Sequence, residues 1–562
     1  MHALSLVQAP STTVADALVT WLVDAGVRRA FGVSGGGVAA LWAAMSRSDA
    51  LSMVHTQHEG GAVFAATEAS LATGELVVVM VTTGPGLTNA LTGLVAARQE
   101  GARVLLISSL TPTGRRGRGA TQETGPEGPL AALYAAGAVM HVAAPVESAA
   151  QLRAMLHKVA WGLADPGGFV AHLGLPSDVA QGQHGPIPYA PVRRPTPAVA
   201  PAILAELATT LERGEALILV GREAGEARHG LLELVERVGA PVVSAPQGKG
   251  VLPEDHPCHL GVVGFAGGEH VAAALAARPF QTLLVLGAAL GEAETGYMAE
   301  LRPDRQIVLV GPRAEPPHGA YADVAHTVVT APVSTLVEGR LARARPGPTL
   351  VPPTPPPAPR RSGRARAHGP VRPAALMEAV QRTIVEGSDA ILLAECGNTF
   401  AWAIHHLRLP EPRLRVSVGW GSMGHVSMGA IGVAAAGRRA VALVGDGAML
   451  MGHEIVTAAR HRLDVVWIVL NDAGYGMCRH GMAAMGLSAS ELDQPEVDFA
   501  ALARSLGVRG ATIRDERDLE PRLAEALSWP GPTVIDVRID PDERPPIGAR
   551  VSGLTFHAQP RA

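Results

Sequence analysis

Short apolar runs alternate with longer Ala/Leu-rich stretches along most of the chain. The runs are rich in Val, Ile and Leu, and they occupy residues 76–81, 104–107, 216–220, 282–286, 440–444 and 465–470. Runs that are apolar throughout are typical of parallel strands buried on both faces, and the stretches between them are typical of the covering helices. The pattern therefore predicts an α/β fold built from doubly wound parallel sheets.

Two proline-rich stretches divide this pattern into three parts, one near residues 182–201 and one near residues 345–370. Proline fixes φ and lacks a backbone N–H, so such stretches do not join helices or central strands. We expect three α/β domains at residues 1–185, 198–342 and 371–545. Residues 343–370 are expected to form a Pro/Arg-rich linker, for which a solvated connection is favoured over a nucleic-acid-binding arm.

Composition narrows the class of protein. The chain has 562 residues, of which 47% are hydrophobic and 17% charged, enough apolar material for several cores and too little charge for a disordered chain. Its net charge of -4 provides no basic field for a nucleic-acid partner. The cysteines Cys258, Cys396 and Cys478 are too far apart in sequence for a Cys-x-x-Cys motif or a disulfide scaffold.

Two segments bear on membrane association. The first ten residues lack a basic region followed by a long apolar one, so we expect no signal peptide and a cytoplasmic protein. Residues 76–97 are uncharged and long enough to span a bilayer. However, Gly84-Pro85-Gly86 and Asn89 would leave backbone groups unpaired in lipid. A buried strand, a turn and a buried helix are the better prediction, with no membrane partner.

Two carboxylates follow two of the predicted strands in the third part. Asp446, between Gly445 and Gly447, ends the strand at 440–444, and Asn471-Asp472 ends the strand at 465–470. Open α/β sheets bind ligands at the carboxyl ends of their strands, and glycines there leave N–H groups free for phosphate oxygens. Gly-Asp-Gly alone is an ordinary turn. Together with the second strand end, it predicts a Mg²⁺ or Ca²⁺ site completed by diphosphate oxygens.

The segment from Gly445 to Asp472 resembles the thiamine-diphosphate motif of the acetolactate synthase and pyruvate decarboxylase superfamily. The resemblance covers nearly the whole chain. It implies an N-terminal pyrimidine-binding domain, a central domain and a C-terminal diphosphate-binding domain. The implied cofactors are thiamine diphosphate and Mg²⁺, with Ca²⁺ or Mn²⁺ able to take its place. Asp446, Asp472 and the carbonyl of Gly474 would hold the metal, although family members usually have Asn at the position of Asp472.

A second motif, His58-Glu59 at the start of a helix-like stretch, resembles the catalytic glutamate of that family. The resemblance implies that the Glu59 carboxyl promotes the imino tautomer of the cofactor's aminopyrimidine, which then removes the thiazolium C2 proton. Gly36 would bring bare backbone next to the reacting carbon. Gln122 resembles a side chain that reaches the substrate region. With Glu59, these are the expected catalytic residues.

Several loops resemble those that contact the cofactor in the family, at its pyrimidine ring, its diphosphate and its bent centre. The resemblance implies further cofactor contacts in these loops. They are Glu59, Thr83, Pro85, Asn89, Gly397, Asn398, Thr399, Gly421, Met423, Gly445, Asp446, Gly447, Ala448, Met451, Asp472, Gly474, Tyr475, Gly476 and Met477. His425, Arg479 and His480 are candidate substrate contacts. For these last three, and for Gly36, Gln122 and Met451, a structural role remains open.

The central part departs from the family pattern. Acetolactate synthases carry Arg-Phe-Asp-Asp-Arg after the strand found here at 282–286, where the first Arg recognises the acceptor 2-oxo acid and the run touches FAD. Here residues 288–294 read Ala-Ala-Leu-Gly-Glu-Ala-Glu, and Gly311-Pro312 replace an Asp that contacts FAD. Neither Ala nor Glu can bind a carboxylate as a guanidinium does. We expect no FAD requirement and an acceptor other than a second pyruvate.

The resulting prediction is a thiamine-diphosphate- and Mg²⁺-dependent carboligase that forms an acyl anion from a 2-oxo acid or related donor and passes it to an unknown acceptor. A non-oxidative 2-oxo acid decarboxylase is the alternative, weakened because residues 111–116 lack the His pair common in such enzymes. A nicotinamide-dependent oxidoreductase is a remote alternative, since the glycines at 32–37 do not have the Gly-x-Gly-x-x-Gly spacing. The resemblance implies a homodimer or homotetramer with active sites at the subunit interface.

Overall fold

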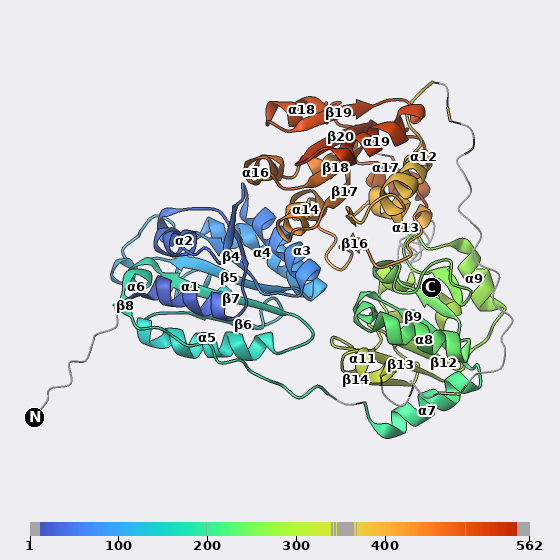
Figure 1. Ribbon diagram of the computed structural model, residues 1–562, viewed down its shortest axis with the longest axis horizontal. Coiled ribbons are helices and arrows are strands. Elements are labelled where there is room, and N and C mark those ends of the chain that lie inside the picture. The colour runs from blue at the N-terminus through green and yellow to red at the C-terminus, as the bar shows by residue number, and fades with distance from the viewer. Residues whose placement is uncertain are drawn as a thin grey trace, which may run out of the picture.

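The computed structural model describes residues 12–547 except 198, 339–340, 342–343, 346–362, 364, 367 and 489–490. Within these residues the chain forms three six-stranded parallel sheets, one in each predicted domain, flanked by helices (Figure 1). The predicted fold class is therefore confirmed, while the domain boundaries stay predictions. The segment on which the signal-peptide expectation rested, and most of the predicted linker 343–370, lie outside the described residues.

The first sheet has the strand order β3-β2-β4-β5-β7-β6, and a short antiparallel pair, β1 with β8, lies beside it. The strands of this domain are β1 (Thr12–Thr13), β2 (Arg29–Gly32), β3 (Ser52–His55), β4 (Val77–Val81), β5 (Arg103–Leu110), β6 (Val142–Pro145), β7 (Phe169–Pro176) and β8 (Gln183–His184). Its helices are α1 (Val14–Asp24), α2 (Ala39–Ser46), α3 (Glu59–Thr73), α4 (Pro85–Glu100), α5 (Ala149–Leu163) and α6 (Ser177–Gln181).

Both faces of this sheet are buried, as its apolar runs predict. In β4, Val77, Val79 and Val81 pack into the core under α3 and α4, whereas Val78 and Met80 pack into the core with α1, α2 and α5. The apolar stretch 76–97 is thus a strand, a turn and the buried helix α4. None of the described helices is both long and apolar enough to cross a membrane.

The central sheet has the order β11-β10-β9-β12-β13-β14. Its strands are β9 (Ala216–Val220), β10 (Val242–Ser244), β11 (His259–Val262), β12 (Thr282–Leu286), β13 (Gln306–Gly311) and β14 (His326–Thr330). Its helices are α7 (Pro201–Glu212), α8 (Arg228–Val238), α9 (Glu269–Ala276), the short α10 (Glu292–Thr295) and α11 (Ser334–Val337). The strands expected at 216–220 and 282–286 are confirmed.

The third sheet has the order β16-β15-β17-β18-β20-β19. Its strands are β15 (Ile391–Ala394), β16 (Leu414–Val416), β17 (Ala440–Gly445), β18 (Val465–Asn471), β19 (Arg509–Ile513) and β20 (Thr533–Arg538). Its helices are α12 (Pro373–Val380), α13 (Asn398–His406), α14 (His425–Ala435), α15 (Asp446–Met449), α16 (Glu454–His461), α17 (Gly476–Ala484), α18 (Phe499–Ser505) and α19 (Leu519–Ser528).

The first and third domains share one core through α3 and α14, which lie side by side between the two sheets (Figure 1). Small residues allow this close approach. A Cβ added to Gly432 would fall on the carbonyl oxygen of Ala65, and one added to Gly429 would lie 3.2 Å from the carbonyl oxygen of Phe64. The contact fixes α3, the helix that begins at Glu59, against α14 of the third domain.

A buried group of charges crosses the same contact. Glu68 of α3 accepts a hydrogen bond from His425 Nε2 (2.9 Å) and pairs with Arg415 Nε (3.2 Å), and all three side chains are almost inaccessible to solvent. Burial alone would raise the pKa of Glu68, but Arg415 and His425 lower it to about 2. The pairing compensates charges that would otherwise be costly to bury.

Candidate active site

A cavity of about 710 Å³ opens at the carboxyl ends of β16, β15, β17 and β18. Loops that follow these strands form most of its wall, residues 289–294 and Phe265 of the central domain form another part, and Gln99 of α4 completes it. Parallel α/β sheets bind ligands at this edge because the strand ends and helix N-termini converge there. The sequence predicted a site at this edge of the third sheet.

Asp446 and Asp472 both line this cavity, each directly after a strand. Asp446 is buried, and its carboxylate accepts hydrogen bonds from Gly447 N (2.7 Å) and Gly474 N (3.0 Å). Burial raises the pKa of Asp472 to about 7, and the neighbouring charge of Asp446 adds to that rise. One buried and one partly buried carboxyl group that repel each other form a site that a bound cation would stabilise.

The groups around these carboxylates fit a diphosphate bound through a divalent cation. Asn398 Oδ1 is buried without a hydrogen-bond partner. A Cβ on Gly476 would fall on Asp472 Oδ2 and lie 2.9 Å from Asn398 Nδ2, so only glycine leaves this backbone open. Within the described residues no three His, Cys, Asp or Glu side chains cluster around one metal position. The remaining ligands would be oxygens of the backbone and the diphosphate, the hard donors that Mg²⁺ prefers.

Most of the predicted cofactor contacts of the third domain line this cavity together. They are Gly397, Asn398, Thr399, Gly421, Met423, Gly445, Asp446, Gly447, Ala448, Asp472, Gly474, Tyr475, Gly476 and Met477.

The predicted catalytic glutamate lies in the first domain, at the first position of α3. Its side chain is buried, and Glu59 Oε2 accepts a hydrogen bond from Asn89 Nδ2 (3.0 Å) of α4. His58 caps the helix, because its Nδ1 accepts a hydrogen bond from Gly60 N (3.0 Å). A Cβ on Gly86 would lie 3.5 Å from Glu59 Oε1, so the start of α4 and the turn that leads into it lie close to the carboxylate.

Other predicted residues of the first domain gather near this turn. Thr83 Oγ1 donates a hydrogen bond to Gln122 Oε1 (3.2 Å), and Gln122 has a left-handed φ of 55°. A Cβ on Gly35 would lie 2.9 Å from Thr82 Oγ1, so this glycine lies against the same strand end. A Cβ on Gly36 would meet no atom within 4 Å, so its backbone faces open space.

The first-domain group and the third-domain cavity are separate in this chain. None of the first-domain residues predicted for the site lines the cavity; these are Gly36, Glu59, Thr83, Pro85, Asn89 and Gln122. The two regions are nevertheless held in fixed relation, because Glu454 of α16 accepts hydrogen bonds from Gln57 N (3.0 Å) and His58 N (3.2 Å).

Four side chains that the sequence analysis expected to contact substrate or cofactor lie outside this cavity, and their roles stay predictions. His425 is fully buried and paired with Glu68. Met451 does not line the cavity and is 54% exposed. Arg479 and His480 do not line it either; Arg479 pairs with Asp493 (3.0 Å), and His480 contacts the carbonyl of Pro541 (3.1 Å). A spacing pattern does not show which side of a helix faces the cavity.

The cavity also contains residues that the sequence did not single out for this role. Gln99 and Phe265 come from other domains, and Ser417 and Trp420 come from the loop after β16. Gln99 lies near the end of α4, and neither spacing nor residue type distinguishes it from other helix residues. Trp420 directly precedes the predicted contact Gly421 in the sequence, and this position was the one feature that could have indicated that Trp420 lines the cavity.

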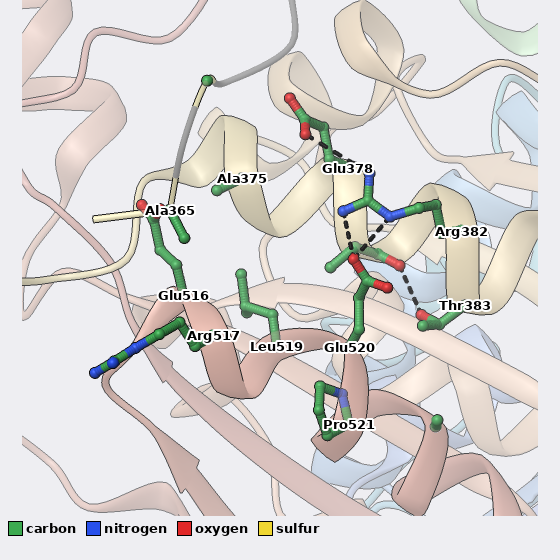
Figure 2. Close-up of a pocket in the computed structure, with 13 residues that line it drawn as sticks. Ala365, Ala375, Glu378, Arg382, Thr383, Glu516, Arg517, Leu519, Glu520 and Pro521 are labelled. Atoms are coloured by element: carbon green, nitrogen blue, oxygen red, sulfur yellow. Dashed lines mark hydrogen bonds and ion pairs between the residues drawn. The ribbon is translucent and has the colours of Figure 1, made fainter. Parts of the chain in front are cut away.

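A second cavity, of about 680 Å³, lies between α12 and α19 (Figure 2). Its charges compensate one another, because Arg382 bridges Glu520 (2.5 Å) and Glu378 (3.7 Å). The cavity at the strand ends differs, because no Arg, Lys or His is among the described residues that line it. The predicted cofactor contacts of the third domain lie in the cavity at the strand ends, and none of them lines this second cavity.

Comparison with known families agrees with this geometry. Models of the thiamine pyrophosphate enzymes match the N-terminal TPP binding domain at residues 12–127, the central domain at 204–335 and the C-terminal TPP binding domain at 395–537. The chain belongs to the thiamine pyrophosphate enzymes. Thiamine pyrophosphate, also called thiamine diphosphate, is thus its cofactor. The first match covers the glycines at 32–37, which rejects the nicotinamide alternative.

Individual relatives of this thiamine pyrophosphate enzyme span its whole length. It is similar to the acetolactate synthase large subunit of Parasynechococcus marenigrum, with 29% identity over 98% of this chain and 92% of the relative. The acetolactate synthase isozyme 1 large subunit of Escherichia coli is 27% identical, with 95% of both chains covered. The thiamine diphosphate-dependent 4-hydroxybenzoylformate decarboxylase of Rhodococcus jostii shares the fold, with a TM-score of 0.80 and 22% identity over 95% of this chain and 100% of that one.

Proposed function

We propose that the protein is a thiamine-diphosphate- and Mg²⁺-dependent carboligase that converts a 2-oxo acid or related donor into an acyl anion equivalent and joins it to an acceptor. The observation that carries the proposal is the pair Asp446 and Asp472 at adjacent strand ends, in one cavity with Asn398, whose Oδ1 has no hydrogen-bond partner. The acetolactate synthases among the relatives, which cover more than nine-tenths of the chain, support carbon–carbon bond formation.

Each group has a distinct part in the proposed chemistry. Thiamine diphosphate supplies the thiazolium carbon that stabilises the acyl anion. Asp446, Asp472 and the Gly474 carbonyl would hold Mg²⁺, or Ca²⁺ or Mn²⁺ in its place, and the glycine N–H groups would bind phosphate oxygens. Glu59 holds or releases a proton at its carboxyl group, and Asn89 keeps that group oriented through the 3.0 Å hydrogen bond.

We propose that each complete site combines the Glu59 region of one subunit with the Asp446 cavity of another, so that the smallest active form is a homodimer, or a homotetramer. The separation of the two regions in one chain supports this arrangement. Exposed apolar side chains on the third domain also support it, because a monomer would leave them in water. They are Trp420, Leu450, Met451, Tyr475, Met485 and Leu487.

We further propose that the enzyme works without FAD and that its acceptor is not a second pyruvate. Residues 289–294 of the central domain form a wall of the cavity and supply carboxylates in place of arginines. The lack of a His pair at residues 111–116 supports carboligation over simple decarboxylation.

The decisive experiment supplies purified protein with thiamine diphosphate, Mg²⁺, a panel of 2-oxo acids and a panel of aldehydes. We expect CO₂ release and more acyloin than free aldehyde product. Predominant release of the donor-derived aldehyde would establish the decarboxylase alternative. Failure to bind thiamine diphosphate by calorimetry, or stoichiometric FAD in the purified protein, would contradict the corresponding part of the proposal.

A further inference from the structure

The central-domain wall of the active-site cavity is acidic. Glu292 and Glu294 line it, together with Ala289, Gly291 and Ala293. Among the described residues that line the cavity, none is Arg, Lys or His. The charged side chains that this chain contributes to its own cavity are therefore all carboxylates, and two of them lie apart from the predicted metal ligands.

Glu294 is the more enclosed of the two. Gly291 packs against its carboxylate, since a Cβ there would lie 2.9 Å from Glu294 Oε2. Burial raises the pKa of the Glu294 carboxyl against the opposing effect of a hydrogen bond from its own backbone, and the nearby Glu100 adds to the rise. Glu100 itself is compensated, because it pairs with Arg222 (2.5 Å) and accepts from Gln247 (3.2 Å). No such side-chain partner compensates Glu294, and ionising it without one is costly.

Basic groups near this wall are already engaged elsewhere. Arg313, which acts on Glu294 at longer range, pairs with Glu223 (2.5 Å) and donates a hydrogen bond to the carbonyl of Gln99 (2.5 Å). The compensating charge for Glu294 is therefore absent from the described part of the chain around the cavity, and a ligand can supply it.

A second, independent feature also indicates a missing ligand. Ser417 lines the same cavity from the third domain, is only 6% exposed, and its buried hydroxyl has no hydrogen-bond partner. A buried hydroxyl without a partner loses its interaction with water and gains nothing in return. A polar group bound in the cavity would satisfy it.

We infer that the acceptor carries a cationic group of the amidinium, guanidinium or ammonium class, and that this group pairs with Glu294. Glu292 adds electrostatic attraction at the exposed side of the wall, and Ser417 offers a hydrogen bond. This inference rests on the proposed carboligase function and names its acceptor class. An acceptor carboxylate would instead meet two like charges and no cation from this chain. Glu292 and Glu294 are thus specificity-determining residues.

The proposed reaction needs no oxidant or reductant. The donor loses its carboxylate as CO₂, its former carbonyl carbon forms a bond to the aldehyde carbon of the acceptor, and the acceptor oxygen gains a proton. The cationic group takes no part in bond making. The role of the cationic group is to hold the acceptor aldehyde in the cavity. Changing the charge of the acceptor should therefore alter the rate of acyloin formation and leave CO₂ release from the donor unaffected.

Three aldehydes of similar shape test this inference on the enzyme loaded with thiamine diphosphate and Mg²⁺: 4-formylbenzamidine (cation), 4-methylbenzaldehyde (neutral) and 4-formylbenzoate (anion). We expect kcat/KM for the acyloin product to fall in that order. Glu294→Gln should reduce the cation-to-anion ratio about tenfold or more, as expected for loss of a desolvated charge pair. The matched control is Glu315→Gln, an exposed glutamate of the same domain outside the cavity.

A binding measurement separates this inference from the proposed function. In calorimetry with the loaded enzyme, unreactive benzamidine should bind more tightly than benzoate, and Glu294→Gln should remove that difference. Absence of CO₂ release from every 2-oxo acid would overturn the proposed function, while the calorimetry still decides the inference. Preference for 4-formylbenzoate, or a charge preference unchanged in Glu294→Gln, would overturn the inference. If that variant fails to fold, the comparison of benzamidine with benzoate on the unsubstituted enzyme decides it.

Discussion

The two regions predicted to act on the cofactor differ in how many of their polar and charged groups have partners within the chain. In the first domain, Glu59 is held by Asn89, and Thr83 by Gln122, so the polar groups have partners before any ligand binds. In the third domain, Asp446 and Asp472 repel each other and Asn398 has an unpartnered oxygen. The polar groups of the first region are thus held in place by the chain itself, as a predicted proton-transfer group requires, whereas those of the second region would be compensated by a bound ligand.

The largest expected effect comes from the organised region. Glu59→Gln keeps the size of the side chain and removes its acid, so kcat should fall by about a thousandfold or more while thiamine diphosphate still binds. Steady-state kinetics and calorimetry measure the two quantities. Glu75→Gln, at a partly exposed ion pair of the same domain, is the control. Turnover at the level of the unsubstituted enzyme would remove Glu59 from the mechanism.

Mixing two inactive variants tests whether the regions complete each other across subunits. Glu59→Gln and Asp446→Asn should each be inactive, yet hybrids formed after mild dissociation should recover activity, up to about a quarter of the normal level for random pairing of dimers. Size-exclusion chromatography confirms that the hybrids form. Hybrid dimers without activity would place both regions of a site in one subunit.

The next largest effect concerns the buried charges that link the two domains. Glu68→Gln leaves His425 and Arg415 without their carboxylate, and the free energy of unfolding should fall by about 3–5 kcal/mol. Urea denaturation measures it, and Glu520→Gln at the half-exposed pair with Arg382 should change stability by less than about 1 kcal/mol. Equal effects in both variants would contradict a special role for the buried group.

The same group predicts a pH dependence. Glu68 has a pKa of about 2, below its ordinary value of 4.5. Its contribution to the free energy of unfolding is therefore complete above pH 4.5 and is lost as the pH falls towards 2. Burial opposes a charged His425, but Glu68 raises the pKa of His425 above its ordinary value of 6.5. The contribution of His425 to the free energy of unfolding is therefore present below pH 6.5 and is lost as the pH rises through the raised pKa. Glu68→Gln should flatten both limbs of a denaturation series against pH.

A smaller effect is expected where the two helices touch. Gly432→Ala would push a methyl group onto the carbonyl of Ala65 and should cost about 1–3 kcal/mol of stability. Gly114→Ala is the matched control, because its added methyl group would meet no atom within 4 Å. Thermal denaturation compares the two. If the losses are equal, the close approach of α3 and α14 does not require glycine.

The smallest expected effect is at the predicted metal site of the third domain. Asp472→Asn removes one negative charge from the predicted metal site, and the affinity for Mg²⁺ in the presence of thiamine diphosphate should fall about tenfold. Calorimetric titration of Mg²⁺ measures this, with Asp518→Asn, an exposed carboxylate of the same domain outside the cavity, as the control. Unchanged affinity would indicate that Asp472 does not bind the metal.

The apolar runs were enough to predict the fold class and several of the strands, and the motifs after two of these strands were enough to predict a metal site, because each depends on local pattern. Continuous apolar runs require burial on both faces, and Asp446 and Asp472 follow strands that a parallel sheet brings together at one edge. The acidic segment at 288–294 is likewise apparent from the sequence.

Which side of each helix faces which neighbour became apparent from the packing of the domains alone. His425 and Asp446 are both buried acid–base groups in the same domain, yet one pairs with Glu68 of another domain and the other lines the cavity. Gln99, Phe265 and Ser417 likewise enter the cavity from three different domains. Their positions depend on how domains pack against each other, through contacts between residues that are far apart in the chain, and no local pattern encodes such contacts.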